Sequence, residues 1–242
     1  MAFMPEHAPL VILMFLGAIG LTGFAALVAL VSVFLKRKWF ALGAAGVSAV
    51  TALVYGLVLA AVSLTSYQVV LPKGDWKYFC EIDCHIAYSV AGVESAAALG
   101  PELQQTTAHG KFVVVRLKTW FDEHSISPHR GDAPLVSGER QVVLLDGMGR
   151  SFAPSSEGAA ALSRIAGAPG PFSRPLRPGE SFTTTLVFDV PQDARGLLLF
   201  VTDPGDDLFT RLIIDHENSF LHKKIYLALD QATAIHSSKV LP

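Results

Sequence analysis

The sequence has little of what catalysis or nucleic-acid binding requires. It contains two cysteines among 242 residues, and its formal net charge is -2. Outside the triplet Lys36-Arg37-Lys38 the basic residues form no cluster, so the chain lacks the positive surface by which proteins bind nucleic acids. No complete catalytic motif, such as the G-x-S-x-G of serine hydrolases, is present. These absences exclude a nucleic-acid partner and favour a protein that is not an enzyme.

Charged residues are also missing from two long apolar runs near the N-terminus. No Asp, Glu, Lys, Arg or His lies within residues 10–35 or 39–66. About 20 apolar residues suffice for a helix to cross a bilayer, and each run is longer than that. The sequence therefore predicts a two-helix transmembrane hairpin over residues 1–66, with helices at about 10–35 and 39–66. The uncharged interior argues against an ion or proton path through this hairpin.

The distribution of basic residues predicts the topology of the hairpin. The segment before the first run has no lysine or arginine, and the run is too long for a secretory signal peptide, so we expect this helix to be retained. Short loops rich in Lys and Arg stay in the cytoplasm, which places the Lys36-Arg37-Lys38 loop there. The N-terminus and everything after Ser66 then lie in the periplasm. We predict a two-pass protein of the bacterial inner membrane, in contact with the lipid bilayer.

Small residues are frequent in both predicted helices. They are Gly17 and Gly20 in the first helix and, at every fourth position of the second, Ser48, Ala52, Gly56 and Ala60. Small side chains let the backbone of a neighbouring helix approach closely. Two interpretations stay open: these residues pack the two helices against each other, or they bind other membrane subunits of a larger complex.

Beyond residue 66 the hydrophobic period changes to two, which is typical of strands. Strands bounded by turn sequences are predicted at 111–120, 141–146, 181–190, 196–202 and 224–229. A capped helix is predicted at 155–165 and a loop at 169–178. This pattern predicts an antiparallel β-sandwich over residues 67–230 and a C-terminal tail at 231–242. The fold class is a membrane-anchored all-β protein.

Three stretches carry a family resemblance. They are GKFVVVRLKTW at 110–120, VVLLDGMGRSFAPS at 142–155 and LRPGESFTTTLVFDVPQDARGLLLFV at 176–201. Over about residues 110–201 the chain resembles bacterial exported immunoglobulin-like sandwich domains of unassigned function, described as telokin-like. The resemblance implies an immunoglobulin-like sandwich outside the cytoplasm and no particular chemistry. The usual Asn after the first strand is replaced here by Phe121-Asp122.

Both cysteines lie in one short segment, Cys80-Glu-Ile-Asp-Cys84-His85. An exported compartment favours a disulfide, which would require a turn at residues 81–83, because an extended strand would separate the two Cα atoms by about 13 Å. Two thiolates and an imidazole are also the donor set that selects copper. Covalent haem attachment is a third alternative. The fourth is two reduced or buried cysteines without any chemistry. In a continuous strand, every second residue from Tyr78 to Tyr88, both cysteines included, would face one side, as a core face should.

The Cys-x-x-x-Cys spacing resembles that of the binuclear copper centres in oxidase second subunits, which also carry a two-helix hairpin before an exported β domain. In this chain the motif precedes the predicted strands and His85 directly follows Cys84, unlike that family. We expect no cofactor, with copper at Cys80, Cys84 and His85 as the alternative. His216 and His222 are weaker metal candidates, because a spacing of six matches neither one helical face nor a compact metal motif.

Three functions are consistent with this pattern. The first is a non-enzymatic accessory subunit of a bacterial inner-membrane complex, by analogy a respiratory or photosynthetic electron-transport complex, with the hairpin bound to other membrane subunits. The alternative is a copper-binding or thiol-redox protein that uses Cys80, Cys84 and His85. A ligand sensor ranks third, because the chain has almost no cytoplasmic part and would need a membrane partner to signal.

Overall fold

The computed structural model describes residues 2–3, 8–79, 85–127, 129–136, 140–167, 170, 172–203 and 208–229. Their contacts divide into two compact units. The hairpin unit contains the described residues of 8–68 and 208–224. The β unit contains those of 69–203 and 225–229, together with the short strand near the N-terminus.

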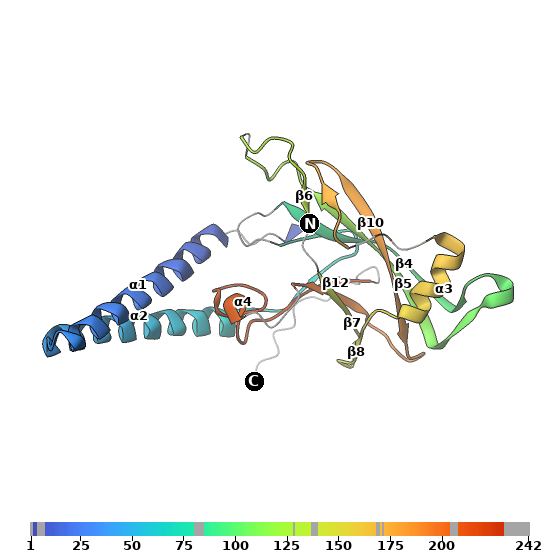
Figure 1. Cartoon of the computed structure of the whole chain (residues 1–242). Helices are drawn as coiled ribbons and strands as arrows, with labels where there is room; N and C mark the ends of the chain where they lie inside the picture. The colour runs from blue at the N-terminus through green and yellow to red at the C-terminus, as the bar shows by residue number, and fades with distance from the viewer. Residues whose placement is uncertain are drawn as a thin grey trace. The chain divides into compact units, whose positions relative to one another are not determined.

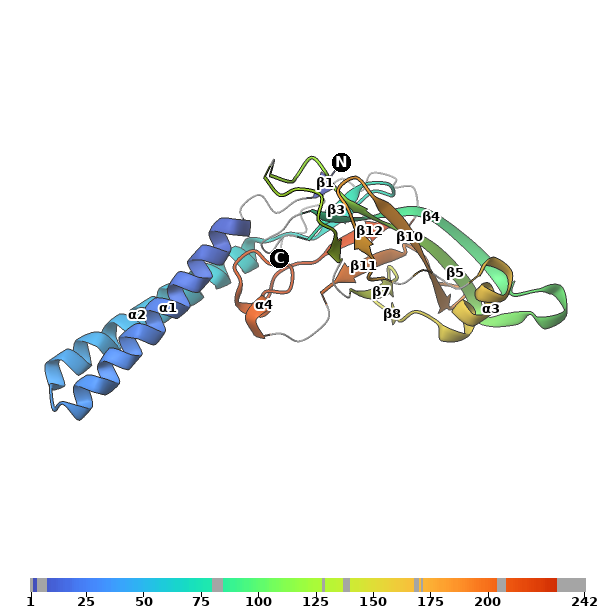
Figure 2. The same cartoon turned by 45° about the horizontal axis from the view of Figure 1, so that its top comes forward.

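Two long helices and one short helix form the hairpin unit. Helices α1 (Ala8–Phe34) and α2 (Lys38–Thr65) lie side by side, and α4 (Leu208–Leu212) lies beside them, as Figures 1 and 2 show. The turn between the long helices is closed by the Arg37 N–H, which donates to the Ser32 carbonyl at 2.8 Å. Both helices are long and apolar enough to cross a membrane. Only 17% and 11% of their most apolar stretches are buried by the described chain.

The β unit consists of antiparallel-rich sheets. One sheet has the order β1-β3-β4-β5-β10 and the other β2-β12-β11-β7-β8. Strand bounds in the first are Ala2–Phe3, Trp76–Tyr78, Ile86–Leu99, Thr106–Phe121 and Ser181–Val190. In the second they are Val69–Leu71, Ile225–Ala228, Leu198–Thr202, Gln141–Leu145 and Ser151–Phe152. Strands β6 (Leu135–Val136) and β9 (Pro175–Leu176) form a separate pair, and a 3₁₀ turn occupies Glu102–Gln104. Pairing is parallel for β1 with β3 and for β2 with β12, and antiparallel for the other described pairs.

The two five-stranded sheets share one hydrophobic core. Alternate residues of β5, Val113, Val115 and Leu117, are fully buried in the same cluster as Leu144 and Leu199 of the other sheet. This follows from the period of two along a strand, which turns every second side chain to the same side. A smaller cluster on the outer side of β5 is covered by helix α3 (Ser156–Ala166).

A buried lysine links the two sheets. Lys77 of β3 is 1% exposed, and its ammonium group donates to the carbonyls of Val201 at 2.6 Å and Ile225 at 3.1 Å in the other sheet. The same ammonium lies 4.8 Å from the centre of the Phe79 ring. Charged side chains are rarely buried to this extent unless they are paired, and the two carbonyls supply that pairing.

The strands predicted from the hydrophobic pattern are present as β5, β7, β10, β11 and β12. Helix α3 is also present as predicted, and the hydroxyl of Ser155 caps it by accepting from the Gly158 N–H at 3.0 Å. The continuous strand considered from Tyr78 to Tyr88 is wrong, because β3 and β4 pair antiparallel and the chain reverses between them. The predicted loop at 169–178 contains the short strand β9.

Candidate functional site

The inner seam of the hairpin is formed by one face of each long helix. Phe15 and Ala25 of α1 and Leu59 and Ser63 of α2 are buried. The hydroxyl of Ser48 donates to the Thr22 carbonyl at 3.3 Å, across the two helices. On α1 the positions 15, 22 and 25 are seven and three residues apart, spacings that keep side chains near one face of a helix. The seam defines which side of each helix is left for other partners.

The predicted small residues lie largely outside this seam. A Cβ atom built on Gly17, Gly20 or Gly56 meets no other atom within 4 Å, so nothing in the described chain packs closely against these glycines. Ala52 is exposed, whereas Ser48 and Ala60 are half-buried. The reason is geometric: four residues exceed one helical turn by about 40°, so a four-residue repeat that begins at the seam rotates away from it. Along α2, this row of small residues therefore turns from the side that faces α1 toward the outer surface of the hairpin.

The predicted cysteine site falls mainly outside the described residues. Cys80 and Cys84 are not among them, and His85 is. The imidazole of His85 stacks on Phe121, with ring centres 5.6 Å apart, and its Nδ1 lies 2.8 Å from the Ser125 hydroxyl. Because that hydroxyl donates to the Asp122 carbonyl at 2.9 Å, Nδ1 of His85 is the donor in this contact. A metal at this ring would therefore bind Nε2, and the copper and thiol-redox hypotheses stay predictions.

A hydrogen-bonded carboxylate stands next to His85. The Asp122 side chain accepts from the Tyr78 hydroxyl at 2.7 Å and from the His124 backbone N–H at 2.9 Å. Burial by itself would raise the pKa of Asp122, but the hydrogen bonds from Tyr78 and His124 outweigh it and hold that pKa below its ordinary value. Burial and the bond to Asp122 raise the pKa of Tyr78. The arrangement fixes the corner after β5 and leaves Asp122 ionised at neutral pH.

The weaker metal candidates have separate local partners. Nδ1 of His216 accepts from the Asn218 backbone N–H at 3.0 Å. Nδ1 of His222 donates to the Lys223 carbonyl at 2.7 Å, and its Nε2 lies 3.4 Å from Asp215. Among the described residues, no group of three or more His, Cys, Asp or Glu side chains could hold a metal ion. These contacts organise turns, as the polar sequence of this stretch predicts.

An open depression on the outer side of the first sheet was not predicted. It has a volume of about 360 Å³ and is lined in part by Lys73, Trp76, Ser89 and Lys118. The rings of Trp76 and Trp120 lie 5.1 Å apart, and the Lys118 ammonium is 5.7 Å from the Trp76 ring centre. The Lys118 ammonium is thus held over an aromatic face by a cation–π contact. The Lys118-x-Trp120 spacing, which puts both side chains on one side of a strand, is the signal that could have found this depression.

Comparison with known proteins assigns no family to the chain. No protein-family model matches the sequence, and no curated protein is similar to it at a significant level. Solved structures similar to part of it include a conserved hypothetical protein from Bacillus anthracis, with 16% identity and a TM-score of 0.38 over 51% of this chain and 89% of that one. A secreted protein of Mycobacterium tuberculosis, MPT63, has 14% identity and a TM-score of 0.38 over 59% of this chain and 94% of its own.

Proposed function

We propose that this protein is a non-enzymatic accessory subunit of a bacterial inner-membrane complex. In this proposal α1 and α2 span the membrane, and the β unit is an immunoglobulin-like β-sandwich on the periplasmic face. The outer surface of the hairpin binds other membrane subunits.

The open space around the outward glycines carries this proposal. Membrane helices associate where small residues allow backbones to approach, since lipid offers no hydrophobic driving force for packing. Gly17, Gly20 and Gly56 provide such positions and have no close neighbour in the described chain. The seam between α1 and α2 uses other residues, so an incoming helix could bind without displacing it.

Two features support the immunoglobulin-like sandwich. The inward side chains of the two five-stranded sheets pack into one cluster, as they do when two sheets lie face to face. The Lys77 ammonium bonds to the backbone of the opposite sheet. Sequence resemblance over residues 110–201 points to the same class of exported domain.

The test is purification of the tagged full chain from membranes of its native host, with mass spectrometry of the proteins that accompany it. We expect stoichiometric membrane partners with the native chain and a several-fold lower recovery of them with Gly56→Leu, because the added side chain fills the approach surface. Gly46→Leu is the matched control. Gly46 is also a glycine of α2 with no atom within 4 Å of a built Cβ, and it points about 80° away from Gly56 around the helix.

Two results would count against the proposal. One is a native chain that is monomeric in mild detergent and recovers no membrane partner. The other is equal loss of partners in Gly56→Leu and Gly46→Leu, since it would show that any added bulk on α2 is harmful. Circular dichroism of both variants establishes that the helices are retained.

A further inference from the structure

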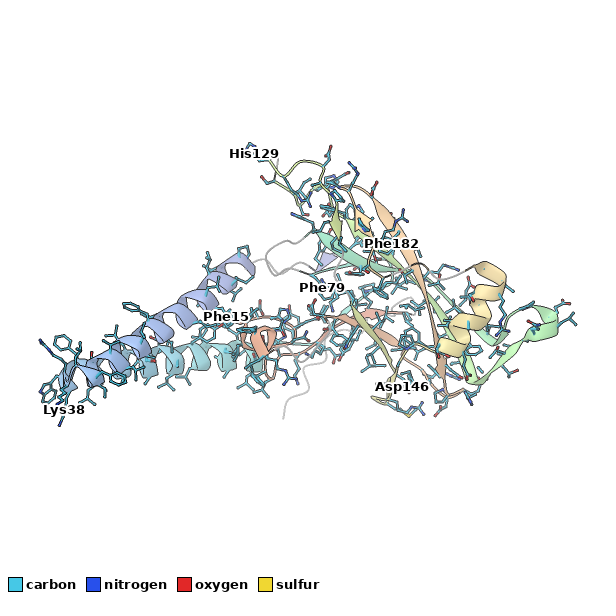
Figure 3. The ribbon with its side chains drawn as sticks, in the orientation of Figure 1. Phe15, Lys38, Phe79, His129, Asp146 and Phe182 are labelled. Carbon is cyan, nitrogen blue, oxygen red and sulfur yellow. The ribbon has the colours of Figure 1, made fainter. Side chains whose placement is uncertain are left out.

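The segment Leu208–Lys224 is bound along the hairpin, on the half remote from the Lys36-Arg37-Lys38 turn. The Tyr55 hydroxyl of α2 donates to the Leu212 carbonyl at 2.7 Å. The ring of Phe209 meets that of Phe15 edge to face, with centres 6.3 Å apart, and Figure 3 shows Phe15 beside α4 and Lys38 at the opposite end of the hairpin. Further along, the Lys223 N–H donates to the Ser66 hydroxyl at 2.9 Å. These contacts fix the level of the segment along the helices.

That level can be compared with the thickness of a bilayer. With a rise of 1.5 Å per residue, Tyr55 lies about 25 Å from the start of α2 at Lys38, and Phe15 lies about 28 Å from the end of α1 at Phe34. The hydrocarbon core of a bilayer is about 30 Å thick. If the basic turn and the 86% exposed Trp39 mark one boundary, the contacts at Tyr55 and Phe15 fall just inside the other. Ser66 lies about 16 Å beyond Tyr55, at or above the lipid headgroups.

The side chains of the segment have the polarity that this level requires. Four large apolar side chains are exposed: Leu208 at 60%, Phe209 at 61%, Phe220 at 47% and Leu221 at 68%. The Phe220 N–H donates to the Arg211 carbonyl at 3.2 Å, and the Arg211 guanidinium lies 5.9 Å from the Phe220 ring centre. Such a concentration of apolar surface on a short polar segment marks an interaction site. Long cationic side chains beside it can reach lipid phosphates while their stems stay apolar.

We infer that Leu208–Lys224 is an interfacial membrane element. The four apolar side chains insert at the boundary between acyl chains and headgroups, and Arg211 and Lys223 contact phospholipid phosphates. The bilayer is the partner because the segment continues the lipid-facing surface of the hairpin at the depth where that surface meets the headgroups. The inference rests on the membrane-spanning hairpin of the proposed function. It adds a second, peripheral contact with the membrane, made by a segment more than 140 residues later in the chain.

Photo-crosslinking of the full chain tests this inference directly. The photoreactive amino acid p-benzoylphenylalanine replaces Leu221 in one variant and Phe209 in another, and each purified protein is reconstituted into vesicles of phosphatidylcholine and phosphatidylglycerol in equal parts. Leu27 of α1, 57% exposed and about 10 Å from the helix end at Phe34, is the control for the bilayer core. Met148, 63% exposed in the turn between β7 and β8, is the control for the β unit. We expect lipid adducts at 221 and 209 in several-fold higher yield than at 148.

Each other outcome has a defined meaning. If lipid adducts form at 27 but the yields at 209 and 221 are no higher than at 148, the inference is overturned. The spanning hairpin is then left intact. No lipid adducts at 27 would overturn the hairpin, and the inference with it. Adducts at 221 to a second protein instead of lipid, in native membranes, would replace the bilayer by a protein partner. Lipid adducts at 221 without any co-purifying subunit would overturn the proposed function alone.

Discussion

Tyr78 and Asp122 form a buried pair that couples β3 to the end of β5. Tyr78 is 5% and Asp122 6% exposed, and the 2.7 Å hydrogen bond between them has a charged acceptor. Tyr78→Phe keeps the ring and removes the donor. We expect the free energy of unfolding of the full chain in mild detergent to fall by about 1.5–3 kcal/mol, the usual contribution of a hydrogen bond to a charged group. Tyr67→Phe is the control, because Tyr67 is 78% exposed; an equal loss there would refute the special role of the Tyr78 bond.

The same carboxylate predicts a pH dependence of stability. The pKa of Asp122 is lower in the folded chain than its ordinary value of 3.8, so the unfolded chain takes up its proton first as the pH falls. The stabilisation is complete well above that value and is lost as the pH falls through the folded-state pKa. Asp122→Asn should therefore be less stable at neutral pH and should lose less stability on acidification below about pH 4.

Chemical unfolding measured between neutral pH and pH 3 would check this prediction. Asp132→Asn is the matched control, since Asp132 lies exposed in a loop of the β unit. Parallel pH profiles for Asp122→Asn and the native chain would contradict the assigned role.

Single residues of the candidate sites were only partly predictable from the sequence. Cys80, Cys84 and His85 stood out because their side chains have distinctive chemistry. Asp122 and Tyr78 did not, since their partnership spans 44 residues and exists only when β3 lies near the end of β5. Lys77 gave no signal either, because a lone lysine in a sequence is normally exposed. Its ammonium is buried here by donating to carbonyls of the opposite sheet, which are distant in the chain.

At the scale of elements, local signals decided what could be predicted. Helix α3 was found because Ser155 caps it and Ala-rich sequence follows. Strand β4 was missed, because its Ala, Ser and Gly content gives a weak strand propensity. Its extended conformation comes from pairing with β5 along nearly its whole length, interrupted by irregularities between Val90 and Gly92 and between Ala96 and Ala98. These residues are therefore extended because they pair with β5, and no local sequence pattern encodes that pairing.

The close approach of α3 to its sheet predicts the effect of a substitution at Gly158. A Cβ at this position would lie 2.5 Å from Cγ1 of Val187 and 3.0 Å from Cε1 of Phe112. Gly158→Val should therefore destabilise the β unit by about 1–3 kcal/mol through overpacking, although valine is a better helix former than glycine. Ala160→Val is the matched control on the exposed face of the same helix. Thermal unfolding of both variants gives the comparison, and equal melting temperatures would contradict tight docking of α3.

For the whole molecule, the sequence separated a long apolar helical hairpin from a β-rich domain because their hydrophobic patterns differ so strongly. It assigned residues 67–230 to one domain, whereas the contacts of residues 208–224 are with the hairpin unit. That grouping depends on a few interactions between distant parts of the chain, such as the bond from Tyr55 to the Leu212 carbonyl. A polar segment between two strands carries no periodic signal for such a partner.

The proposed orientation in the membrane rests on the basic turn between the helices. The bias of Lys and Arg between the two sides sets the topology of short hairpins. We expect alkaline phosphatase fused after residue 229 to be active, because that enzyme matures only in the periplasm, and a fluorescent protein fused after residue 37 to fluoresce in the cytoplasm. Replacing Lys36, Arg37 and Lys38 together by serine should lower the phosphatase activity, since part of the population would insert the other way round. Lys73→Ser removes a positive charge from the side proposed to be periplasmic and should leave the activity unchanged. An inactive phosphatase in the native chain would reverse the proposed topology and place the β unit in the cytoplasm.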